Sequence, residues 1–435
     1  YSKDQLQNII NELKIDEILV AIPSASPATR IEIINQLAPL PVVVRILPSL
    51  PELVGGNLSI KDLHKVQIKD LLGREPVTPN RKLLSKNIFE KTVMVTGAGG
   101  SIGSEICRQI MSLGPNSVVL YEFNELALYN IEKEISELDY YEIKIFPILG
   151  NINDKKRLID VCKLLNVNTI YHTAAYKHVP MVELNNSEGV NNNVFGTLNC
   201  AQAAIDSKVE TFVLISTDKA VRPANTMGAS KRTAELILQA LSKTQNQTIF
   251  SMVRFGNVLG SSGSVIPLFQ DQINNGGPIT LTDANMVRYF MSIPEAVELV
   301  IQAGAMGVGG DVFILDMGKP IKIYDLVIKM VNLSGLSIRN SENPEGDIEI
   351  KYTGLRFGEK LYEELLVGNN VFETDNKLIM RATEEMIDWD VLESILINLD
   401  SALKQGNHKK VRELLITLVP EFNPQSSIVD LLYQE

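Results

Sequence analysis

The stretch KTVMVTGAGGSIGSEI, residues 91–106, decides the fold of this chain. Its first half is a short apolar run, as expected for a buried parallel strand, and its second half begins a helix. Gly97, Gly100 and Gly103 stand between the two, where they let the backbone turn sharply and let a pyrophosphate approach the amides of the helix N-terminus. We therefore predict a strand, a glycine-rich turn that also contains Ser101 and Ile102, and a helix that together bind a dinucleotide.

The next strand supports this prediction and indicates which dinucleotide binds. SVVLYE ends in Glu122, nineteen residues after Gly103, and Asn124 follows shortly. A carboxylate at this place accepts both ribose hydroxyls of an adenosine and repels a 2′-phosphate. The predicted cofactor is therefore NAD rather than NADP.

Two later strand ends complete the predicted cofactor site. GNIND offers Asn151 and Ile152, an amide and a backbone N–H that can read the adenine edge. HTAAYKHVP, residues 172–180, places small residues where a nicotinamide would lie against the sheet. The residues of this stretch assigned to the cofactor are Ala174, Ala175 and Tyr176. Beside them, Lys177 and His178 are expected to face the substrate, although a histidine in such a place is as often structural as catalytic.

Strand and helix patterns alternate from Lys91 through most of the chain. Short continuous apolar strands separated by amphipathic helices predict an α/β fold, a doubly wound parallel sheet of the Rossmann type covered on both faces. The predicted organisation is a partial Rossmann-like unit (1–75), a linker (76–90) and a catalytic domain (91–435). Within that domain we expect an NAD-binding core mainly in 91–250, a smaller substrate-binding lobe mainly in 251–380 and a C-terminal helical segment in 383–435.

The N-terminal unit reads as a strand, a helix and a strand. IDEILVAIPS and PVVVRILPS are the strands, and SPATRIEIINQLA between them is a helix with Ser26 as N-cap and Pro27 in its first turn. SIKDLHKVQIKDLLGR, residues 59–74, is predicted to be helical. One such unit cannot cover both faces of a sheet, so we expect further residues to precede Tyr1 in the natural protein.

Composition disfavours several classes of function. The 435 residues carry a formal net charge of −11, which argues against nonspecific nucleic-acid binding because phosphates would be repelled. Three scattered cysteines favour a reduced, cytosolic setting over a disulfide framework. The four histidines form no cluster with the cysteines, so we expect no metal site. No apolar run of the sequence is long enough to cross a bilayer.

The stretch STDKAVRPANTMGASK, residues 216–231, follows the apolar run ETFVLI. Thr217, Asp218 and Lys219 therefore stand at the carboxyl end of a strand, where open α/β sheets build their active sites. An adjacent acid and amine beside a nicotinamide can supply one base and one acid to neighbouring carbons. The alternative is an exposed, salt-bridging turn with no catalytic role.

Five stretches carry a resemblance to a known family: TGAGGSIGSE, HTAAYKHVP, STDKAVRPANTMGASKR, RFGNVLGSSGSVIPLF and TGLRFGEKLYEEL. Together they resemble the extended short-chain dehydrogenase/reductase superfamily. From about Lys86 onward the chain is similar to the membrane-associated nucleotide-sugar 4,6-dehydratases of bacterial polysaccharide and glycan biosynthesis. The long members of that group carry transmembrane helices ahead of a partial Rossmann-like domain, so the resemblance implies a place on the cytoplasmic face of a bacterial inner membrane.

The superfamily pairs a tyrosine with a lysine in the pattern Y-x-x-x-K. In this chain Lys231 occupies the lysine position, which implies a contact with the nicotinamide ribose, and Met227 occupies the tyrosine position. Methionine cannot accept or donate a proton. Tyr129 and Lys133 share the spacing, but they follow the second strand, far in sequence from the nicotinamide end of the sheet, so we discard them. A further departure is Asn151, where many relatives carry aspartate.

The resemblance therefore implies that the proton transfers moved to Asp218 and Lys219. Asp218 is expected to be the principal base in place of the tyrosine. Lys219 is expected to be the acid–base group at C5 and C6 of the sugar, made less basic by desolvation. Members with methionine are associated with retention at C5, which implies a configuration-retaining UDP-N-acetylglucosamine 4,6-dehydratase; we also expect a homo-oligomer. Two alternatives stay open: a UDP-sugar 4-epimerase, and an inactive sensor of nucleotide sugar or NAD.

By the same resemblance, the second half of the chain supplies the substrate contacts. RFGNVLG places Asn257 toward the sugar, and the following SSGSVIP, which contains Val265, runs along the diphosphate. Arg288 and Arg356 are candidate diphosphate clamps, because the arginine fork suits phosphate oxygens, and Glu359 can hold the uridine ribose hydroxyls. The alternative for each of these residues is an ordinary surface salt bridge.

Overall fold

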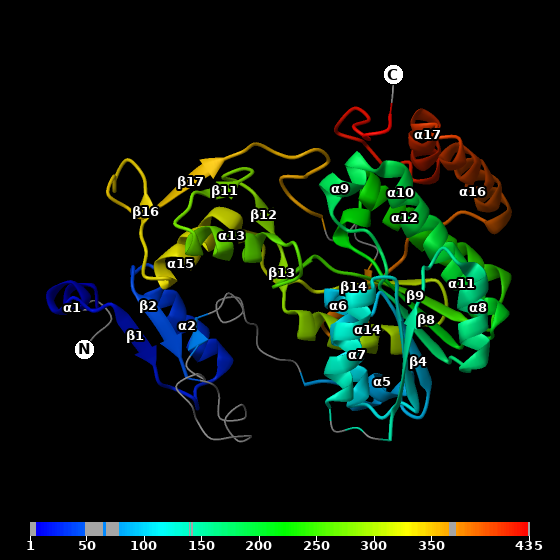
Figure 1. Cartoon of the computed structure of the whole chain (residues 1–435), viewed down its shortest axis with the longest axis horizontal. Coiled ribbons are helices and arrows are strands. Elements are labelled where there is room, and N and C mark those ends of the chain that lie inside the picture. Colours follow the sequence, from blue (N-terminus) through cyan, green and yellow to red (C-terminus); the bar gives the residue numbers. More distant parts are fainter. Residues whose placement is uncertain are drawn as a thin grey trace. The chain divides into compact units, whose positions relative to one another are not determined.

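The structure is a computed structural model that describes residues 6–47, 64–66, 78–138, 140, 142–364 and 371–433. The chain divides into two compact units, and in Figure 1 its elements are labelled and coloured along the sequence. The larger unit comprises Pro79–Gly256, Ile293–Met317 and Arg356–Glu435. The smaller unit comprises Tyr1–Thr78, Asn257–Ser292 and Gly318–Leu355.

The centre of the larger unit is a sheet that contains nine strands among the described residues. Seven neighbouring strands pair in parallel; at one edge β19 pairs antiparallel with the last of them, β14, and β18 pairs antiparallel with β19. In their order across the sheet the strands are β18 (Val371–Glu373), β19 (Ile379–Ala382), β14 (Asp311–Leu315), β9 (Ile249–Arg254), β8 (Thr211–Ile215), β7 (Thr169–His172), β4 (Thr92–Thr96), β5 (Ser117–Glu122) and β6 (Lys144–Leu149). The predicted parallel sheet is confirmed, and the antiparallel edge adds to it.

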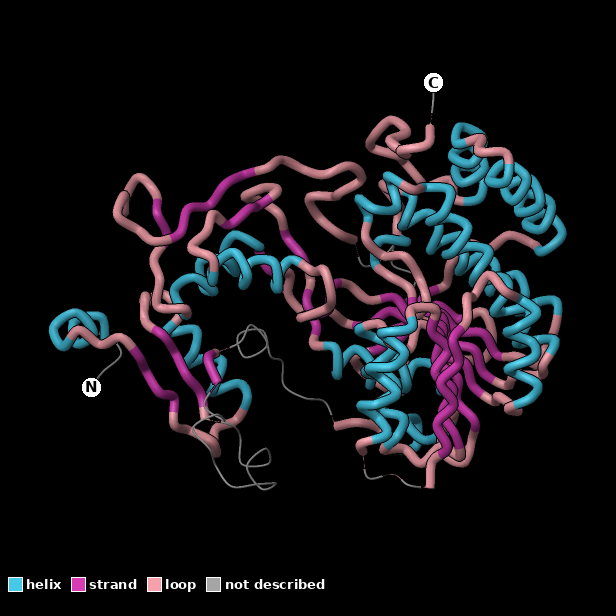
Figure 2. The backbone as a smooth tube through the Cα atoms, in the orientation of Figure 1, coloured by secondary structure: helices cyan, strands magenta, loops and turns pink. Residues whose placement is uncertain are grey.

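Helices cover both faces of this sheet, and in Figure 2 the strands are seen between the two helical layers. One layer contains α5 (Arg81–Lys86), α6 (Ser101–Met111), α7 (Glu125–Ser136) and α14 (Ile293–Met306). The other contains α8 (Lys155–Leu164), α9 (Val179–Leu184), α10 (Asn186–Val190), the π-helix η3 (Asn191–Phe195), α11 (Gly196–Asp206) and α12 (Thr226–Thr244). Because both faces are covered, every residue of β4, β5 and β7 is buried, which explains their continuous apolar sequences.

Two C-terminal helices complete the larger unit, as the sequence predicts. They are α16 (Trp389–Lys404) and α17 (His408–Leu418). Both pack against α12, and their leucines join the same hydrophobic core as the α12 leucines. For this reason sixteen of the 19 residues of α12 are buried, including the charged Lys231, Arg232 and Glu235.

The strand order brings the predicted cofactor turn to a definite place. β4 lies between β5 on one side and β7 on the other, so successive strands of the chain leave β4 in opposite directions. At such a switch point the loops that follow the two strands diverge, and a crevice opens at the carboxyl edge of the sheet. The loops after β4, β5, β6, β7 and β8 all lie at this edge because these strands are parallel.

The smaller unit begins with a helix that was not predicted, followed by the predicted strand, helix and strand. The elements are α1 (Leu6–Leu13), β1 (Glu17–Val20), α2 (Pro27–Leu37) and β2 (Val43–Ile46). β1 and β2 pair in parallel, Ser26 caps α2 through the Thr29 N–H, and Pro27 lies in the first turn. Their core includes Leu333 of α15 (Ile323–Leu333), so this N-terminal segment packs on a later part of the chain.

The helix predicted for residues 59–74 is wrong where it can be compared. His64–Lys65 forms a short strand, β3, that pairs antiparallel with β2. The rest of that prediction lies outside the described residues. The remaining elements of the smaller unit are β10 (Asn257–Val258), α13 (Val265–Asn274), β11 (Ile279–Leu281), β12 (Val287–Arg288), β13 (Phe290–Met291), β15 (Ile321–Lys322), β16 (Ile338–Arg339) and β17 (Ile348–Tyr352).

The compact units do not follow the predicted linear boundaries. The segment predicted as a linker, 76–90, contains α5, which packs against α14. The segment predicted as a substrate lobe, 251–380, is divided, because β14 pairs with β9 of the large sheet while Asn257–Ser292 and Gly318–Leu355 join the N-terminal segment. None of the helices in the described part of the chain has an apolar run long enough to span a bilayer.

Candidate active site

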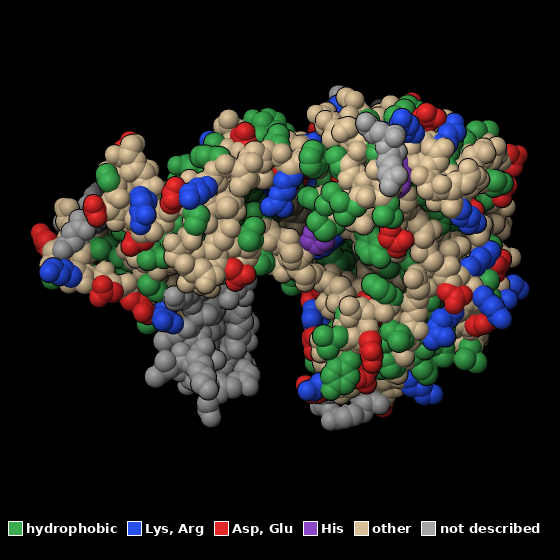
Figure 3. Space-filling view, turned by 45° about the horizontal axis from the view of Figure 1, so that its top comes forward, with side chains coloured by type: hydrophobic (Ala, Val, Ile, Leu, Met, Phe, Trp, Pro, Cys, Tyr) green, Lys and Arg blue, Asp and Glu red, His purple; other side chains and the backbone are tan. Residues whose placement is uncertain are grey.

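A cavity of about 620 Å³ lies at the carboxyl ends of β4 to β7 in the larger unit. The larger unit is hollowed on the face shown in Figure 3, with apolar side chains gathered around the hollow. All predicted cofactor residues except Lys231 line the cavity. The lining comprises Gly97, Gly99–Gly103, Tyr121–Asn124, Ala127, Gly150–Ile152, Thr173–His178, Met181, Val182, Asn185, Glu188, Gly189 and Asn192.

The glycine-rich turn is packed against the end of β7 by backbone contacts. Gly97 has a positive φ of 67°, and a Cβ there would lie 2.9 Å from the Ala174 backbone. A Cβ on Gly103 would lie 2.1 Å from the Gly97 carbonyl oxygen. The Thr173 hydroxyl donates to the Thr96 and Gly97 carbonyls, at 2.7 and 3.1 Å. These contacts admit only glycine at the two positions and bring the start of α6 to the cavity wall.

The start of α6 fits the anionic part of a dinucleotide. Gly100 is the N-cap residue, and no side chain caps the helix. The first amides of an uncapped helix need acceptors from outside the helix, and the helix dipole favours an anion there. Because Gly100, Ser101 and Ile102 line the cavity, a pyrophosphate in it would meet these amides.

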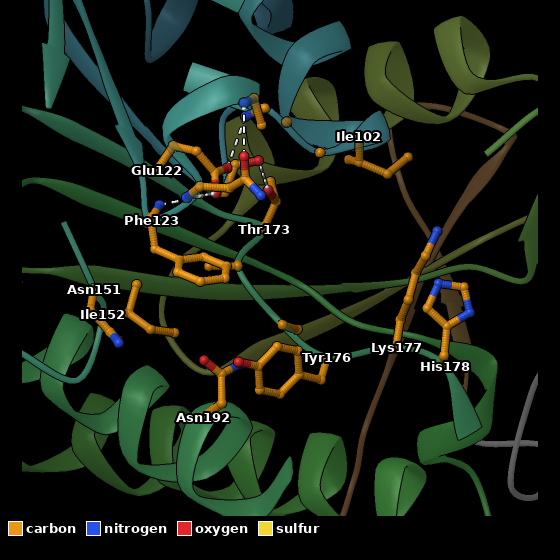
Figure 4. A pocket seen from close by; sticks show the side chains of 18 of the residues that line it. Ile102, Glu122, Phe123, Asn151, Ile152, Thr173, Tyr176, Lys177, His178 and Asn192 are labelled. Carbon is orange, nitrogen blue, oxygen red and sulfur yellow. Dashed lines mark hydrogen bonds between the residues drawn. The ribbon is translucent and has the colours of Figure 1, made fainter. Parts of the chain in front are cut away.

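Glu122 is buried and held in a fixed direction by the backbone (Figure 4). One carboxylate oxygen accepts from the Gly99 N–H at 3.0 Å, and the other accepts from the Phe123 and Asn124 N–H groups, both at 3.0 Å. The Asn124 side chain in turn caps α7. A carboxylate has about four acceptor sites, so Glu122, which uses three of them, keeps about one for a ribose hydroxyl at the cavity wall.

The predicted adenine contacts lie on the same side of the cavity as Phe123 in Figure 4. The Asn151 side-chain oxygen accepts from the Asn153 N–H at 2.9 Å, and its carbonyl accepts from the Tyr121 hydroxyl at 2.9 Å. The Asn151 amide nitrogen has no bond to the described residues and can donate to a ligand. Ile152 is buried at the cavity wall.

Lys177 and His178 lie side by side on the opposite side of the cavity (Figure 4). Partial burial lowers the pKa of Lys177. Partial burial and the neighbouring Lys177 charge lower the pKa of His178, so this imidazole is favoured in its neutral form. Both readings of His178, structural and substrate-contacting, stay open.

Asn193 connects the cavity wall with α12 and was missed in the sequence analysis. Its side chain is fully buried, accepts from the Tyr176 N–H at 2.8 Å and donates to the Tyr176 carbonyl at 3.0 Å. The same amide donates to the Ser230 hydroxyl at 3.0 Å, and Ser230 donates to the Met227 carbonyl at 2.7 Å. The signal that could have found Asn193 is the run of three asparagines at residues 191–193, directly before a helical pattern.

Thr217, Asp218 and Lys219 form a compact hydrogen-bonded turn at the end of β8. The short 3-10 helix η4 (Asp218–Ala220) follows the strand. One Asp218 carboxylate oxygen accepts from the Thr217 hydroxyl at 2.9 Å and from Lys219 Nζ at 3.0 Å. The Asp218 side chain is only 1% exposed and that of Lys219 is 20% exposed. The turn is therefore not an exposed one, because the acid is buried, and its catalytic role stays a prediction.

Met227 and Lys231 lie on the first two turns of α12, both buried. Lys231 Nζ makes no hydrogen bond or ion pair to the described residues. Burial lowers the pKa of Lys231 to about 8, although Glu235 one turn further opposes this shift. By contrast, Tyr129 of the discarded pair is exposed on α7.

None of the five predicted catalytic residues lines the cavity itself. They occupy the end of β8 and the start of α12, next to β7.

A buried ion network lies directly behind these residues. Arg254, at the end of β9, binds both oxygens of Glu235 at 2.8 and 2.6 Å and contacts Glu384 at 2.5 Å. Ser216 donates to Glu235 at 2.6 Å, and Arg232 binds both acids, at 3.1 and 3.3 Å. The arginines lower the pKa of Glu235 to about 2 against the opposing effect of burial. The network therefore joins the last residue before Thr217 to the helix that carries Lys231.

The predicted substrate residues are divided between the two units. In the larger unit Arg356 is exposed, and its N–H donates to the Glu359 carboxylate at 3.2 Å. In the smaller unit Asn257 begins β10, Val265 begins α13 and Arg288 lies buried in β12. Their contact with substrate stays a prediction.

The sheet order, the glycine-rich turn and the uncapped helix define a Rossmann α/β protein of the extended short-chain dehydrogenase/reductase class. Two solved structures share this fold. Pen from Bacillus thuringiensis is 32% identical with a TM-score of 0.60, and the match covers 72% of this chain and 98% of Pen. DesIV, the dTDP-glucose 4,6-dehydratase from Streptomyces venezuelae solved with NAD and TYD bound, is 22% identical with a TM-score of 0.52, over 63% of this chain and 88% of DesIV.

The chain belongs to the polysaccharide biosynthesis protein family, whose model matches residues 93–384. It is 45% identical to the capsular polysaccharide biosynthesis protein CapD of Staphylococcus aureus and to the probable polysaccharide biosynthesis protein EpsC of Bacillus subtilis. Each match covers 85% of this chain, which spans 60% of the length of these two relatives.

Two further relatives carry other descriptions. The uncharacterized membrane protein MJ1061 of Methanocaldococcus jannaschii is 42% identical, over 75% of this chain and 95% of that protein. A UDP-glucose 4-epimerase of Rickettsia rickettsii is 33% identical, over 66% of this chain and 81% of that protein.

Proposed function

We propose that this chain is an NAD-dependent nucleotide-sugar 4,6-dehydratase that converts UDP-N-acetylglucosamine to the UDP-4-keto-6-deoxy sugar with retention at C5. One observation carries the proposal. A hydrogen-bonded acid–lysine pair, Asp218 and Lys219, is buried at the carboxyl end of β8, while Met227 fills the place of the superfamily tyrosine on α12. A protein that removes water from a sugar needs an acid and a base there, whereas a binding module does not.

The residues that line the cavity fit NAD. The uncapped start of α6 suits the pyrophosphate, Glu122 suits the adenosine ribose, and Asn151 and Ile152 suit the adenine. Lys231, buried without a bond to the described residues, suits the hydroxyls of the nicotinamide ribose. When bound, NAD supplies the acceptor for the C4 hydride and later returns that hydride to C6.

The protein's own part of the reaction is proton transfer and orientation. In our proposal Asp218 receives the C4 hydroxyl proton, and Lys219 acts at C5 and C6 when water leaves. Thr217 donates to Asp218 and fixes the direction of its carboxylate. Lys177, His178, Asn257, Val265, Arg288, Arg356 and Glu359 are the proposed substrate contacts.

The comparisons support this proposal at the level of the family. Membership of the polysaccharide biosynthesis protein family fits an enzyme that prepares nucleotide sugars for a surface glycan. The similarity to a relative described as a membrane protein supports membrane association, which we propose to be at the cytoplasmic face of the inner membrane. A homo-oligomeric state is part of the same proposal.

A UDP-sugar 4-epimerase is the second candidate, favoured by the 33% identity to proteins described as UDP-glucose 4-epimerases. An epimerase shares the fold and the cofactor, but it needs no acid–lysine pair to eliminate water and usually keeps the tyrosine. An epimerase product would keep its mass, whereas the dehydratase product loses one water.

The test is incubation of the purified chain with NAD and UDP-N-acetylglucosamine in deuterated water, followed by NMR and mass spectrometry. We expect a product that has lost one water, carries deuterium at C5 and keeps the C5 configuration. An inverted C5 would contradict the link between Met227 and retention. A product of unchanged mass and inverted C4 would favour the epimerase.

Variants of the acid–lysine pair test its role directly. Asp218→Asn and Lys219→Met are each expected to lower turnover by about 10²–10⁴-fold, because general acid–base catalysis contributes that much, while NAD remains bound. Lys91 and Glu210 provide the matched control, since they form a second acid–lysine pair, at 2.6 Å, beside the opposite end of β8. Lys91→Met and Glu210→Gln should leave turnover unchanged, and an equal loss in both pairs would contradict the assignment.

A further inference from the structure

Residues 356–364 (RFGEKLYEE) contact the turn that carries Lys219. The contacts join Gly358 to Asn225 at 2.8 Å, Lys360 to the Arg222 carbonyl at 2.7 Å, Glu364 to Arg222 at 2.8 Å and Glu363 to Lys219 at 3.6 Å. Gly358 has a positive φ of 71°, and a Cβ on it would lie 2.6 Å from the Asn225 Cβ. The close approach therefore depends on this glycine, and it brings a distant part of the sequence to the proposed proton-transfer site.

The approach of this segment places Lys219 between two buried carboxylates. Lys219 Nζ lies 3.0 Å from Asp218 and 3.6 Å from Glu363, whose side chains are 1% and 4% exposed. Opposite charges at this range favour the charged form of each partner, and burial makes them interact more strongly than in water. This acts in the opposite sense to the desolvation that the sequence analysis expected to make Lys219 less basic.

The other charged groups near this turn have different partners. Arg222 pairs with Glu364, Lys360 binds backbone carbonyls, and Glu183 of α9 accepts the Thr226 N–H. On α12, which packs against the turn, Arg232 and Glu235 belong to the ion network with Arg254, and the same helix carries Lys231. Among the described residues, Asp218 and Glu363 are the carboxylates with an ion-pair distance to Lys219.

We propose that Glu363 is a positioning residue that keeps Lys219 an ammonium ion after Asp218 has been neutralised by the C4 hydroxyl proton. This proposal rests on the proposed function. Without Glu363, the first proton transfer would neutralise the carboxylate that lies 3.0 Å from Lys219 just before an acid is needed at C6, and the negative charge 3.6 Å away would be missing as well. With Glu363, one negative partner persists throughout the reaction.

The proton transfers then balance. Lys219 gives a proton to the C6 oxygen as the C6–O bond breaks, and the oxygen leaves as water with the bond's electron pair. The neutral Lys219 amine takes the C5 proton, whose bonding electrons form the C5=C6 double bond. After hydride has reached C6, Lys219 returns this proton to C5. The C4 proton held by Asp218 then moves to Lys219 along their 3.0 Å hydrogen bond, and both groups regain their starting charge.

The first test measures the charge of Lys219 without substrate or cofactor. The full chain is labelled with a trace of acetic anhydride over a range of pH, and acetylation of Lys219 is quantified by mass spectrometry relative to Lys91. In Glu363→Gln the pH midpoint of Lys219 labelling should fall by about one unit, because one of two nearby opposite charges is lost. Glu364→Gln is the matched control: it removes the neighbouring carboxylate, which pairs with Arg222 at the surface, and should leave the midpoint unchanged.

The second test separates oxidation from elimination. With NAD and UDP-N-acetylglucosamine, Glu363→Gln should form bound NADH at the wild-type rate, but the sugar should lose water about tenfold more slowly. The pH above which turnover falls should be lower in this variant than in the wild type. Glu363→Asp should restore part of the rate. A purely structural role would instead lower the unfolding temperature without moving the labelling midpoint.

The outcomes distinguish this inference from the proposed function. An unchanged Lys219 midpoint in Glu363→Gln, or an equal change in Glu364→Gln, would overturn the role of Glu363 whatever the enzyme's activity. A shifted midpoint in a wild-type chain that never removes water from the sugar would support the charge coupling and contradict the dehydratase.

Discussion

The cofactor cavity and the acid–lysine site lie at the same edge of one sheet, but they are built by different means. The cavity is made by strand ends, glycines and backbone amides that all fall between Gly97 and Asn192. The acid–lysine site combines β8, α12 and residues 356–364, and it holds charged side chains out of water. The first site is specified by short-range sequence, whereas the second depends on pairings between distant segments.

This difference has an energetic consequence. A backbone site is sensitive to added volume, because an extra methyl group has no place to go. A site of buried charges is sensitive to the loss of a partner, because the remaining charge is left buried without an opposite charge. Substitutions at the two sites should therefore fail in different ways, and the following predictions compare them.

The largest effect is expected from Arg254→Met, which removes the central cation of the buried network. Glu235 loses two of its hydrogen bonds and Glu384 loses one, so the free energy of unfolding should fall by about 3–5 kcal/mol. Urea unfolding followed by circular dichroism measures this loss. Arg222→Met is the matched control, because its exposed pair with Glu364 should contribute within about 0.5 kcal/mol. Equal losses in the two variants would show that burial does not set the cost.

A smaller effect, confined to the cofactor cavity, is expected from Gly103→Ala. The added Cβ would lie 2.1 Å from the Gly97 carbonyl, so the turn and the start of α6 must move apart. We expect the affinity for NAD to fall about 100-fold, which corresponds to about 2.7 kcal/mol, as measured by calorimetric titration. Ser104→Ala, on the next residue of α6, is the control and should bind NAD normally. Undiminished binding by Gly103→Ala would contradict the backbone account of this site.

The smallest effect is a pH dependence of NAD binding through Lys231. The pKa of Lys231 is lowered by burial to about 8, and ribose hydroxyl oxygens that accept hydrogen bonds from its ammonium form should raise it, so binding takes up protons as the pH increases through 8. The affinity for NAD should therefore fall by roughly threefold to tenfold between pH 7 and pH 9.5. Lys231→Met should bind more weakly at pH 7 and show a flatter profile. A wild-type slope in that variant would assign the pH dependence to another group.

Much of the fold could be predicted because its signals are local. The apolar runs at β4, β5, β7 and β8 are continuous because both faces of the sheet are covered, and all four strands were predicted. The cofactor turn was also visible, since its glycines, the strand before it and the helix after it are adjacent in sequence. By contrast, the pairing of His64–Lys65 with β2 overrode a helical pattern, because strand pairing is decided by a partner elsewhere in the chain.

The sequence by itself determined the parallel sheet, the place of the dinucleotide turn and the candidate pair Asp218 and Lys219. Only the tertiary structure decided that Asp218 is buried, that Glu363 reaches Lys219 across more than a hundred residues, and that Asn193 joins the cavity to α12. It also decided that the N-terminal segment shares a core with α15. The physical reason is that turns, caps and apolar periodicity act between near neighbours, whereas burial and charge pairing exist only after distant segments have packed together.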